Sequence, residues 1–298
     1  MEVLLTGASG FLGKEIFKQL VQMKNFNITT IGRSDENDII CDLSNDSVPG
    51  HNITYDMVVH AAGKAHSVPK TKEEEEDFFN VNYKGTRKIL NGLKENLPNT
   101  IVFISSVSVY GLEHGQMIDE SFSLKGIAPY AKSKILAEKE ILKFCKANDV
   151  NYVILRLPLI SGSNPPGNLG KMINAIKKGY YFRIGKGEAR KSMVSAIDVA
   201  SLIPNLYEKN GIYNLTDRIH PSFKQIEDHI ALIYNKKIMR FPKLPFVMLA
   251  KIGDILPKFI INTDKLNKIT KSLTFSDNKA VKELNWKPSS GLISISIK

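Results

Sequence analysis

The 298-residue chain contains only two cysteines, Cys41 and Cys145, and a single tryptophan. Two cysteines exclude a disulfide framework and a cysteine-rich metal site, so we expect no metal and a reducing compartment. No apolar run is long enough to cross a bilayer, and the N-terminus enters a strand pattern at Val3 without a charged leader. We therefore expect a cytoplasmic protein without a membrane span.

Acidic residues are fewer than basic ones, and the net charge is +11. Part of the excess of basic residues lies in the C-terminal part of the chain. Residues 221–272 include ten Lys and Arg against four Asp and Glu. Such an excess suits a polyanion, a membrane surface or an anionic substrate. No nucleic-acid motif is present, so we expect no nucleic acid partner. In residues 246–266 apolar side chains alternate with lysines; we expect an amphipathic helix packed on its own domain, with membrane contact as the alternative.

The first half of the chain alternates apolar strand patterns with helical patterns. Strands are expected at 3–5, 28–31, 57–60, 101–104 and 152–155, and helices at 13–23, 78–95 and 130–147. We attribute the acidic run 73–77, just before the second helix, to the preference of carboxylates for a helix N-terminus. The alternation predicts an α/β fold, a Rossmann-type doubly wound parallel sheet with right-handed crossovers.

After Pro158 the elements become short and mixed, and a loop-forming stretch follows at 161–168. This change predicts a smaller C-terminal substrate-binding lobe. We expect a dinucleotide-binding domain over residues 1–160, to which 191–216 returns. The substrate lobe then comprises 161–190 and 217–298.

A glycine-rich turn, TGASGFLG at residues 6–13, directly follows the first strand pattern. Gly7 permits a tight turn, Gly10 lets the backbone approach a phosphate, and Gly13 lets the following helix pack closely on the sheet. Free N–H groups at the helix start would face the anion. The turn therefore predicts a dinucleotide site. Ser9, Phe11 and Leu12 belong to the same turn and are expected to contact the cofactor.

The end of the second strand indicates which dinucleotide is bound. NAD usually meets a carboxylate there, whereas an arginine suits the 2′-phosphate of NADP. The expected acid is absent and Arg33 follows the strand, so NADP(H) is favoured. Asp35 lies close by, so NAD(H) stays a possible cofactor. We expect Asp42 and Leu43 near the adenine, and Ala61, Ala62 and Gly63 beside the cofactor.

Tyr130 and Lys134 lie four residues apart in a helical pattern and therefore share a face. A tyrosine has a pKa near 10, so acting as a base near neutrality needs a shift of roughly 3 units. The Lys134 ammonium and an oxidised nicotinamide would both stabilise the phenolate. Ser106 ends a strand that points into the same cleft and can hydrogen-bond the reacting oxygen.

Together these motifs resemble the extended short-chain dehydrogenase/reductase family, in its sugar-nucleotide epimerase/dehydratase group. The resemblance covers nearly the whole chain and is carried by residues 6–13, 42–43, 60–63, 82–86, 105–111, 129–134 and 283–288. It implies that Ser106, Tyr130 and Lys134 form the catalytic set. It also implies contacts of the cofactor with Asn82, Ser105, Tyr130, Lys134 and Pro158. A homodimer through helices 78–95 and 130–147 is common in this family.

Residues that this chain lacks indicate which reactions of the family it does not catalyse. Dehydratases of this group carry an Asp-Glu pair after the catalytic hydroxyl residue, where this chain has Val107 and Ser108. Reducing 3,5-epimerases need a Cys/His-type pair near the sugar, and neither cysteine matches such a position. The resemblance therefore leaves 4-epimerisation or 4-keto reduction.

The substrate is expected to be a UDP-sugar. The local pattern is most similar to bacterial UDP-N-acetylhexosamine 4-ketoreductases and their epimerase relatives. That likeness implies that Asn168, Leu169 and Arg190 hold the diphosphate, although Lys191 occupies the usual arginine position. Lysine would bind as a point charge without a bidentate fork. His66 contacts the sugar or is a structural or surface histidine.

We favour NADP(H)-dependent 4-keto reduction, or the reverse dehydrogenation, of a UDP-N-acetylhexosamine. A UDP-sugar 4-epimerase with tightly held NAD would use the same residues. A dinucleotide-sensing protein without catalysis is the alternative from another class.

Overall fold

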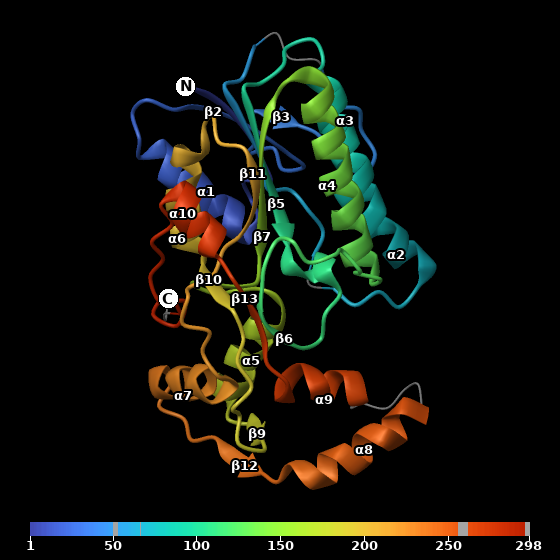
Figure 1. Cartoon of the computed structure of the whole chain (residues 1–298), viewed down its shortest axis with the longest axis vertical. Helices are drawn as coiled ribbons and strands as arrows, with labels where there is room; N and C mark the ends of the chain where they lie inside the picture. The colour runs from blue at the N-terminus through green and yellow to red at the C-terminus, as the bar shows by residue number, and fades with distance from the viewer. Residues whose placement is uncertain (50–52, 66, 256–261, 296–298) are drawn as a thin grey trace.

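The structure is a computed structural model that describes residues 1–49, 53–65, 67–255 and 262–295. A seven-stranded sheet forms its centre (Figure 1). In spatial order the strands are β11 (Gly211–Asn214), β7 (Asn151–Leu157), β5 (Thr100–Ser106), β4 (Met57–His60), β1 (Glu2–Thr6), β2 (Asn27–Gly32) and β3 (Ile39–Ile40). All neighbouring pairs run parallel. The predicted doubly wound Rossmann-type sheet is therefore confirmed.

Helices cover both faces of this sheet. One face carries α1 (Phe11–Val21), α6 (Ala196–Leu202), the 3-10 turn η3 (Ile203–Leu206) and α10 (Asn278–Leu284). The other face carries α2 (Lys72–Phe78), the π-helical turn η1 (Phe79–Lys84), α3 (Gly85–Gly92) and α4 (Pro129–Asn148). The strand order reverses direction between β1 and β4, and ligands bind outside the carboxyl ends of strands at such a switch point.

The pleat of β1 shows why the sheet needs both layers. Val3 and Leu5 pack with Ile16 of α1 in one buried cluster, whereas Leu4 packs with Ile141 of α4 in the other. Successive side chains of a strand point to opposite faces. Each such buried side chain contributes about 1.5–3 kcal/mol, so neither layer can be removed without exposing half of every strand.

The second helical segment begins earlier than the expected start at residue 78, and that prediction was wrong. Thr71 caps α2 by accepting a hydrogen bond from the Glu74 backbone N–H, so the acidic run lies inside the helix. The carboxylates at its first turn stabilise that end through the helix dipole. The chain then passes through η1, whose wider turn contains Asn82, into α3.

Most of the remaining short elements lie in the lower half of Figure 1. Three two-stranded pairs occur among the described residues: β8 (Leu159–Ser161) with β10 (Met193–Ser195), β9 (Phe182–Ile184) with β12 (Met239–Phe241), and β6 (Gly115–Ile118) with β13 (Leu273–Phe275). The other elements are the 3-10 turn η2 (Val107–Tyr110) and helices α5 (Gly167–Lys178), α7 (Phe223–Ile233), α8 (Lys243–Ile255) and α9 (Thr263–Thr270). The chain re-enters the main sheet at β11; the domain boundaries and the homodimer stay predictions.

The segment 246–266 is not one packed amphipathic helix. It spans α8 and α9, which contact each other, and residues 256–261 between them lie outside the described part. Met248, Leu249 and Ile252 of α8 are exposed rather than buried. The expectation that this segment is covered by its own domain was therefore wrong for α8.

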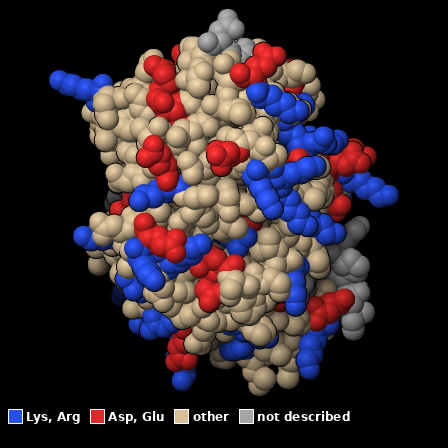
Figure 2. All heavy atoms as spheres, turned by 45° about the horizontal axis from the view of Figure 1, so that its top comes forward, with Lys and Arg blue, Asp and Glu red and all other residues tan. Residues whose placement is uncertain are grey.

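Within the described residues, no helix is long and apolar enough to span a membrane. Basic side chains do not form one continuous patch on the face of the molecule that Figure 2 shows. Basic side chains are interleaved there with acidic ones, with a group of basic side chains at the right edge.

Candidate active site

The glycine-rich turn joins β1 to α1 at the switch point. Gly7 has a φ of 76°, a left-handed conformation that favours glycine, and a Cβ there would lie 2.6 Å from the Ala62 nitrogen. A Cβ at Gly13 would lie 2.0 Å from the Gly7 carbonyl oxygen. Both positions therefore exclude any side chain. The start of α1 at Gly10 carries no side-chain cap, which leaves its first N–H groups free for an anion.

A cavity of about 590 Å³ opens in front of this turn. Its lining includes the start of α1, the ends of β5 and β7, and one face of α4. The predicted residues among its lining are Gly10, Phe11, Leu12, Ala61, Gly63, Ser105, Ser106, Tyr130, Lys134, Pro158 and Asn168. The structure thus brings the turn and the Ser, Tyr and Lys side chains to one space, of the size that small-molecule sites commonly have.

Tyr130 is half-buried at the N-terminal end of α4. Burial raises the pKa of its phenol, and a hydrogen bond with Ser106 offsets part of that rise. Desolvation outweighs this one stabilising contact, and the Lys134 ammonium donates its hydrogen bond to the Ile104 carbonyl oxygen instead. The predicted lowering of the Tyr130 pKa includes the charge of a bound oxidised nicotinamide, and it stays a prediction.

Lys134 is buried, and its ammonium donates a hydrogen bond to the Ile104 carbonyl oxygen at 2.8 Å. It also lies 4.6 Å from the centre of the Phe103 ring. Burial lowers the Lys134 pKa to about 8, while Glu138 raises it. A Cβ at Gly63 would lie 3.2 Å from this ammonium, so glycine leaves the room that the lysine needs.

Glu138 lies one helical turn beyond Lys134 and forms a buried ion pair with Arg156 of β7, at 2.7 Å. Ser105 donates a hydrogen bond to the same carboxylate at 2.5 Å, and Arg156 donates another to the Tyr110 hydroxyl at 3.1 Å. Removing one member of such a pair would leave an uncompensated buried charge. The ion pair thus fixes α4 against the sheet just behind the cavity.

His60, at the end of β4, connects the turn to Asn82 through buried hydroxyl groups. Its Nδ1 lies 2.7 Å from the Thr6 hydroxyl, and its Nε2 lies 2.9 Å from the Thr86 hydroxyl. Thr6 accepts from the Ala62 N–H, and Thr86 donates to the Asn82 carbonyl. A neutral ring that accepts at Nδ1 and donates at Nε2 satisfies all these bonds. Burial, aided by the charge of Lys134, lowers the His60 pKa to about 3.

Asn82 holds the start of α4 in place. Its side chain accepts from the Lys64 N–H at 2.7 Å, and it donates to the Lys64 carbonyl and to the Ser133 hydroxyl. Ser133 in turn donates to the Tyr130 carbonyl at 2.8 Å. Asn82 therefore orients the backbone of Tyr130 from behind. The π-helical turn η1 is what brings its side chain there, and such turns are frequent at functional sites.

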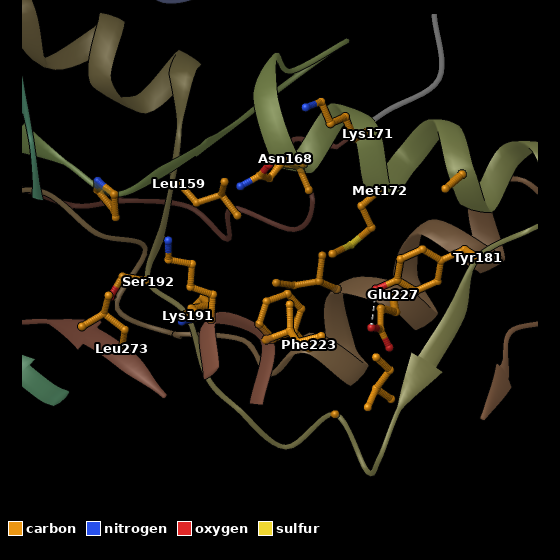
Figure 3. A pocket seen from close by; sticks show the side chains of 18 of the residues that line it. Leu159, Asn168, Lys171, Met172, Tyr181, Lys191, Ser192, Phe223, Glu227 and Leu273 are labelled. Atoms are coloured by element: carbon orange, nitrogen blue, oxygen red, sulfur yellow. Dashed lines mark hydrogen bonds between the residues drawn. The ribbon is translucent and has the colours of Figure 1, made fainter. Parts of the chain in front are cut away.

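A second cavity of about 860 Å³ shares Pro158, Leu159 and Asn168 with the first. Most of its lining is apolar, from α5, β9, α7 and β13. Figure 3 shows Asn168 and Lys191 reaching into the same part of it from opposite walls. On another wall Tyr181 donates a hydrogen bond to Glu227 at 2.7 Å.

Lys191 and Lys268 both line this cavity, and each repels the other's charge. Burial and the Lys268 ammonium lower the Lys191 pKa to about 8. Two neighbouring cations suit an anionic ligand, since the anion would relieve their repulsion. Lys268 had no signal in the sequence, because it comes from α9, far along the chain.

Several predicted residues lie outside both cavities. Arg190 is exposed and donates to the His220 carbonyl, so Lys191 and not Arg190 reaches the cavity. Arg33 is exposed at the end of β2. Hydrogen bonds from Ser44 lower the pKa of Asp42, and the charge of Arg33 lowers it further by a smaller amount. Ser9 is exposed, Leu43 is buried against Gly85, and Ala62 lies against Gly7. Leu169, in contrast, lines the second cavity. His66 lies outside the described residues.

This fold and this grouping of Ser, Tyr and Lys beside a glycine turn define a short-chain dehydrogenase/reductase of the extended type. The chain belongs to the NAD dependent epimerase/dehydratase family, whose model matches residues 3–216. Members that resemble it are enzymes, so the alternative of a dinucleotide sensor without catalysis is set aside.

Three similar proteins illustrate the range of this family. The N-acetyl-alpha-D-glucosaminyl-diphospho-ditrans,octacis-undecaprenol 4-epimerase of Escherichia coli O157:H7 is 29% identical over 250 residues, covering 79% of this chain and 73% of that protein. The GDP-6-deoxy-D-talose 4-dehydrogenase of Aggregatibacter actinomycetemcomitans is 25% identical, with 96% and 97% covered. The structure of UDP-glucuronic acid 4-epimerase from Bacillus cereus, in complex with UDP-glucuronic acid and NAD, superposes with a TM-score of 0.77 at 17% identity, covering 99% and 97%.

Proposed function

We propose that this enzyme transfers a hydride between a nicotinamide dinucleotide and C4 of a UDP-sugar, with 4-keto reduction of a UDP-N-acetylhexosamine as the favoured reaction. The observation that carries the proposal is one cavity lined by the glycine turn, Ser106, Tyr130 and Lys134. It is joined to a second cavity that Lys171, Lys191 and Lys268 line. The turn and α1 would hold the dinucleotide diphosphate, and the bound cofactor would supply or accept the hydride.

The roles of the side chains follow from their contacts. Tyr130 moves the proton of the sugar oxygen, because its side chain hydrogen-bonds with Ser106 and the residue lines the cavity. Ser106 holds that oxygen by a hydrogen bond. Lys134 supplies positive charge behind the phenol while its ammonium is anchored on the Ile104 carbonyl. Asn82 and Ser133 position Tyr130 through its backbone.

In the direction of reduction, the Tyr130 phenol would donate its proton to the ketone oxygen as the hydride arrives at the carbon. Dehydration is not supported, since Val107 and Ser108 follow Ser106 and neither can act as the extra acid or base.

A 4-epimerase is the second candidate, and the similarity to two 4-epimerases favours it. It would use the same residues and return the hydride to the opposite face of the sugar. The first of these relatives acts on a sugar carried by a diphospho-polyprenol. A sugar on that carrier is therefore a second candidate substrate, and the apolar lining of the larger cavity is compatible with it.

NADP(H) remains our proposed cofactor, on the strength of Arg33 at the end of β2. The Arg33 side chain is exposed and free to meet a 2′-phosphate, with Asp42 nearby. Arg33→Ala should weaken NADPH binding about 10- to 100-fold, the value of a charge-assisted hydrogen bond, and leave NADH binding unchanged. Equal losses for both dinucleotides would exclude this role.

The function is tested by analysing the dinucleotide released from denatured purified protein and by assaying three substrates. These are UDP-N-acetylglucosamine, UDP-glucose and a 4-keto-6-deoxy UDP-sugar. A reductase consumes NADPH with the keto sugar, whereas an epimerase converts the alcohol sugars without net change in the cofactor absorbance. Absence of turnover with all three, in protein that binds dinucleotide, would contradict the proposal.

A further inference from the structure

Helix α8 presents an apolar stripe to solvent. Leu244, Met248 and Ile252 follow one another at four-residue intervals and therefore share one face of the helix. Their exposed fractions are 66%, 60% and 47%. Met239 and Phe241 of the preceding strand β12 are exposed as well. We call these five residues the α8 stripe, and contiguous exposed apolar side chains of this kind usually mark a binding surface.

The chain's described residues do not cover the α8 stripe because α8 packs on its other side. Ala250 and Gly253, opposite the stripe on the helix, are the buried positions. Asp254 fixes the end of α8 by accepting hydrogen bonds from the Thr263 backbone N–H and hydroxyl at the start of α9. In Figure 1, α8 is the outermost helix at the lower end of the molecule.

The chain segment that carries the stripe is strongly basic. Residues 236–255 contain five Lys and Arg and a single acid, Asp254, which the hydrogen bonds with Thr263 already engage. Lys236, Lys237, Arg240, Lys243 and Lys251 are all exposed. A helix with an apolar face and basic flanks fits the interface of an anionic bilayer, where the apolar side chains enter the acyl boundary and the cations meet the headgroups.

The stripe is also continuous with the wall of the larger cavity. Phe182 of β9 lines that cavity and contacts the rings of Phe241 and Phe246, with centroids 5.2 Å and 5.6 Å away. Strand β12, which carries part of the stripe, pairs with β9 along its length. A surface that holds the stripe would therefore lie close to the rim of the cavity.

We propose that the α8 stripe and its basic flanks dock the protein on the surface of an anionic phospholipid bilayer, with α8 lying parallel to the membrane plane. A second copy of the chain is disfavoured as the occupant, because two basic surfaces would repel each other. This proposal of membrane docking does not depend on whether the substrate itself is carried by a lipid.

The test is co-sedimentation of the full chain with vesicles of phosphatidylcholine alone or of phosphatidylcholine mixed with phosphatidylglycerol. The protein should bind the mixed vesicles at low salt and lose most of that binding at high salt. Leu244→Ser combined with Met248→Ser and Ile252→Ser should weaken binding at least about ten-fold, because three buried apolar side chains are lost. Lys243→Glu with Lys251→Glu should weaken it similarly.

Leu232→Ser with Ile293→Ser is the matched control, since both side chains are exposed but lie outside the stripe. It should leave vesicle binding unchanged. All variants should retain the thermal unfolding and dinucleotide binding of the unmodified protein, because none of the changed residues lines either cavity. Failure to bind mixed vesicles, or equal loss in the control, would overturn the proposal. So would light scattering that shows a dimer converted to a monomer by the stripe variant without any vesicle binding.

Discussion

The two cavities are built by different means. Around the first, backbone and buried polar groups set the geometry: Gly7 and Gly13 admit no side chain, and Asn82 and Glu138 lie in closed hydrogen-bond networks. Around the second, apolar side chains from four separate elements meet, with Lys191 as a partly buried cation. The first arrangement suits catalysis, which needs reacting groups in fixed positions. The second suits substrate recognition, whose specificity can change when single side chains are substituted.

Tyr130→Phe should have the largest effect and acts only on the first cavity. Loss of the proton-transfer group should lower turnover about 10²- to 10⁴-fold, while the affinity for dinucleotide stays unchanged. Steady-state kinetics and dinucleotide titration measure the two quantities. The proposed distinction between the cavities fails if turnover changes less than about ten-fold.

Arg156→Met tests whether the first cavity depends on its buried ion pair. The variant leaves the Glu138 carboxylate buried without a cation, which should cost about 3–5 kcal/mol of unfolding free energy. Arg87→Met is the matched control, because Arg87 is exposed and lies 3.9 Å from Glu140; it should cost at most about 1 kcal/mol. Urea unfolding of both variants gives the comparison, and similar losses in the two would contradict it.

The neutral state of His60 predicts a pH effect on stability. Its pKa is about 3 in the fold and 6.5 as the ordinary value, so the unfolded chain binds more protons between these limits. Stability from this group is present above pH 6.5 and is lost as the pH falls towards 3, by about 3 kcal/mol at about pH 4. In His60→Gln this part of the loss should be missing. Parallel stability curves for both proteins would show that His60 does not titrate as described.

Lys191→Ala should have a smaller effect, confined to the second cavity. Loss of a charge-assisted contact should raise the KM for a UDP-sugar about 10- to 100-fold with kcat nearly unchanged. Arg190→Ala, one residue away but exposed and bound to the His220 carbonyl, is its control and should change KM less than about two-fold. Equal effects at both positions would remove the proposed role of Lys191.

The difference between the two cavities also explains which parts of the fold and site could be predicted from the sequence. The order of the Rossmann elements, the turn at Gly7 and the spacing of Tyr130 and Lys134 are local patterns, and the sheet was predicted from them. Glu138 could also have been found, since it continues the four-residue spacing on the same helix. Lys268 could not, because only the packing of α9 brings it to Lys191. The pKa of Tyr130 and the exposure of α8 depend on burial, which hydrophobic pattern alone does not determine.

The most direct test of the central claim follows a deuterium label. The enzyme would be incubated with a 4-keto-6-deoxy UDP-sugar and nicotinamide dinucleotide carrying deuterium at its hydride position, and with C4-deuterated UDP-N-acetylglucosamine for epimerisation. We predict deuterium at C4 of the product in at least one of these reactions, and formation of that product about 10²- to 10⁴-fold more slowly with Tyr130→Phe. Deuterium at another carbon, or its loss to solvent, would contradict hydride transfer at C4.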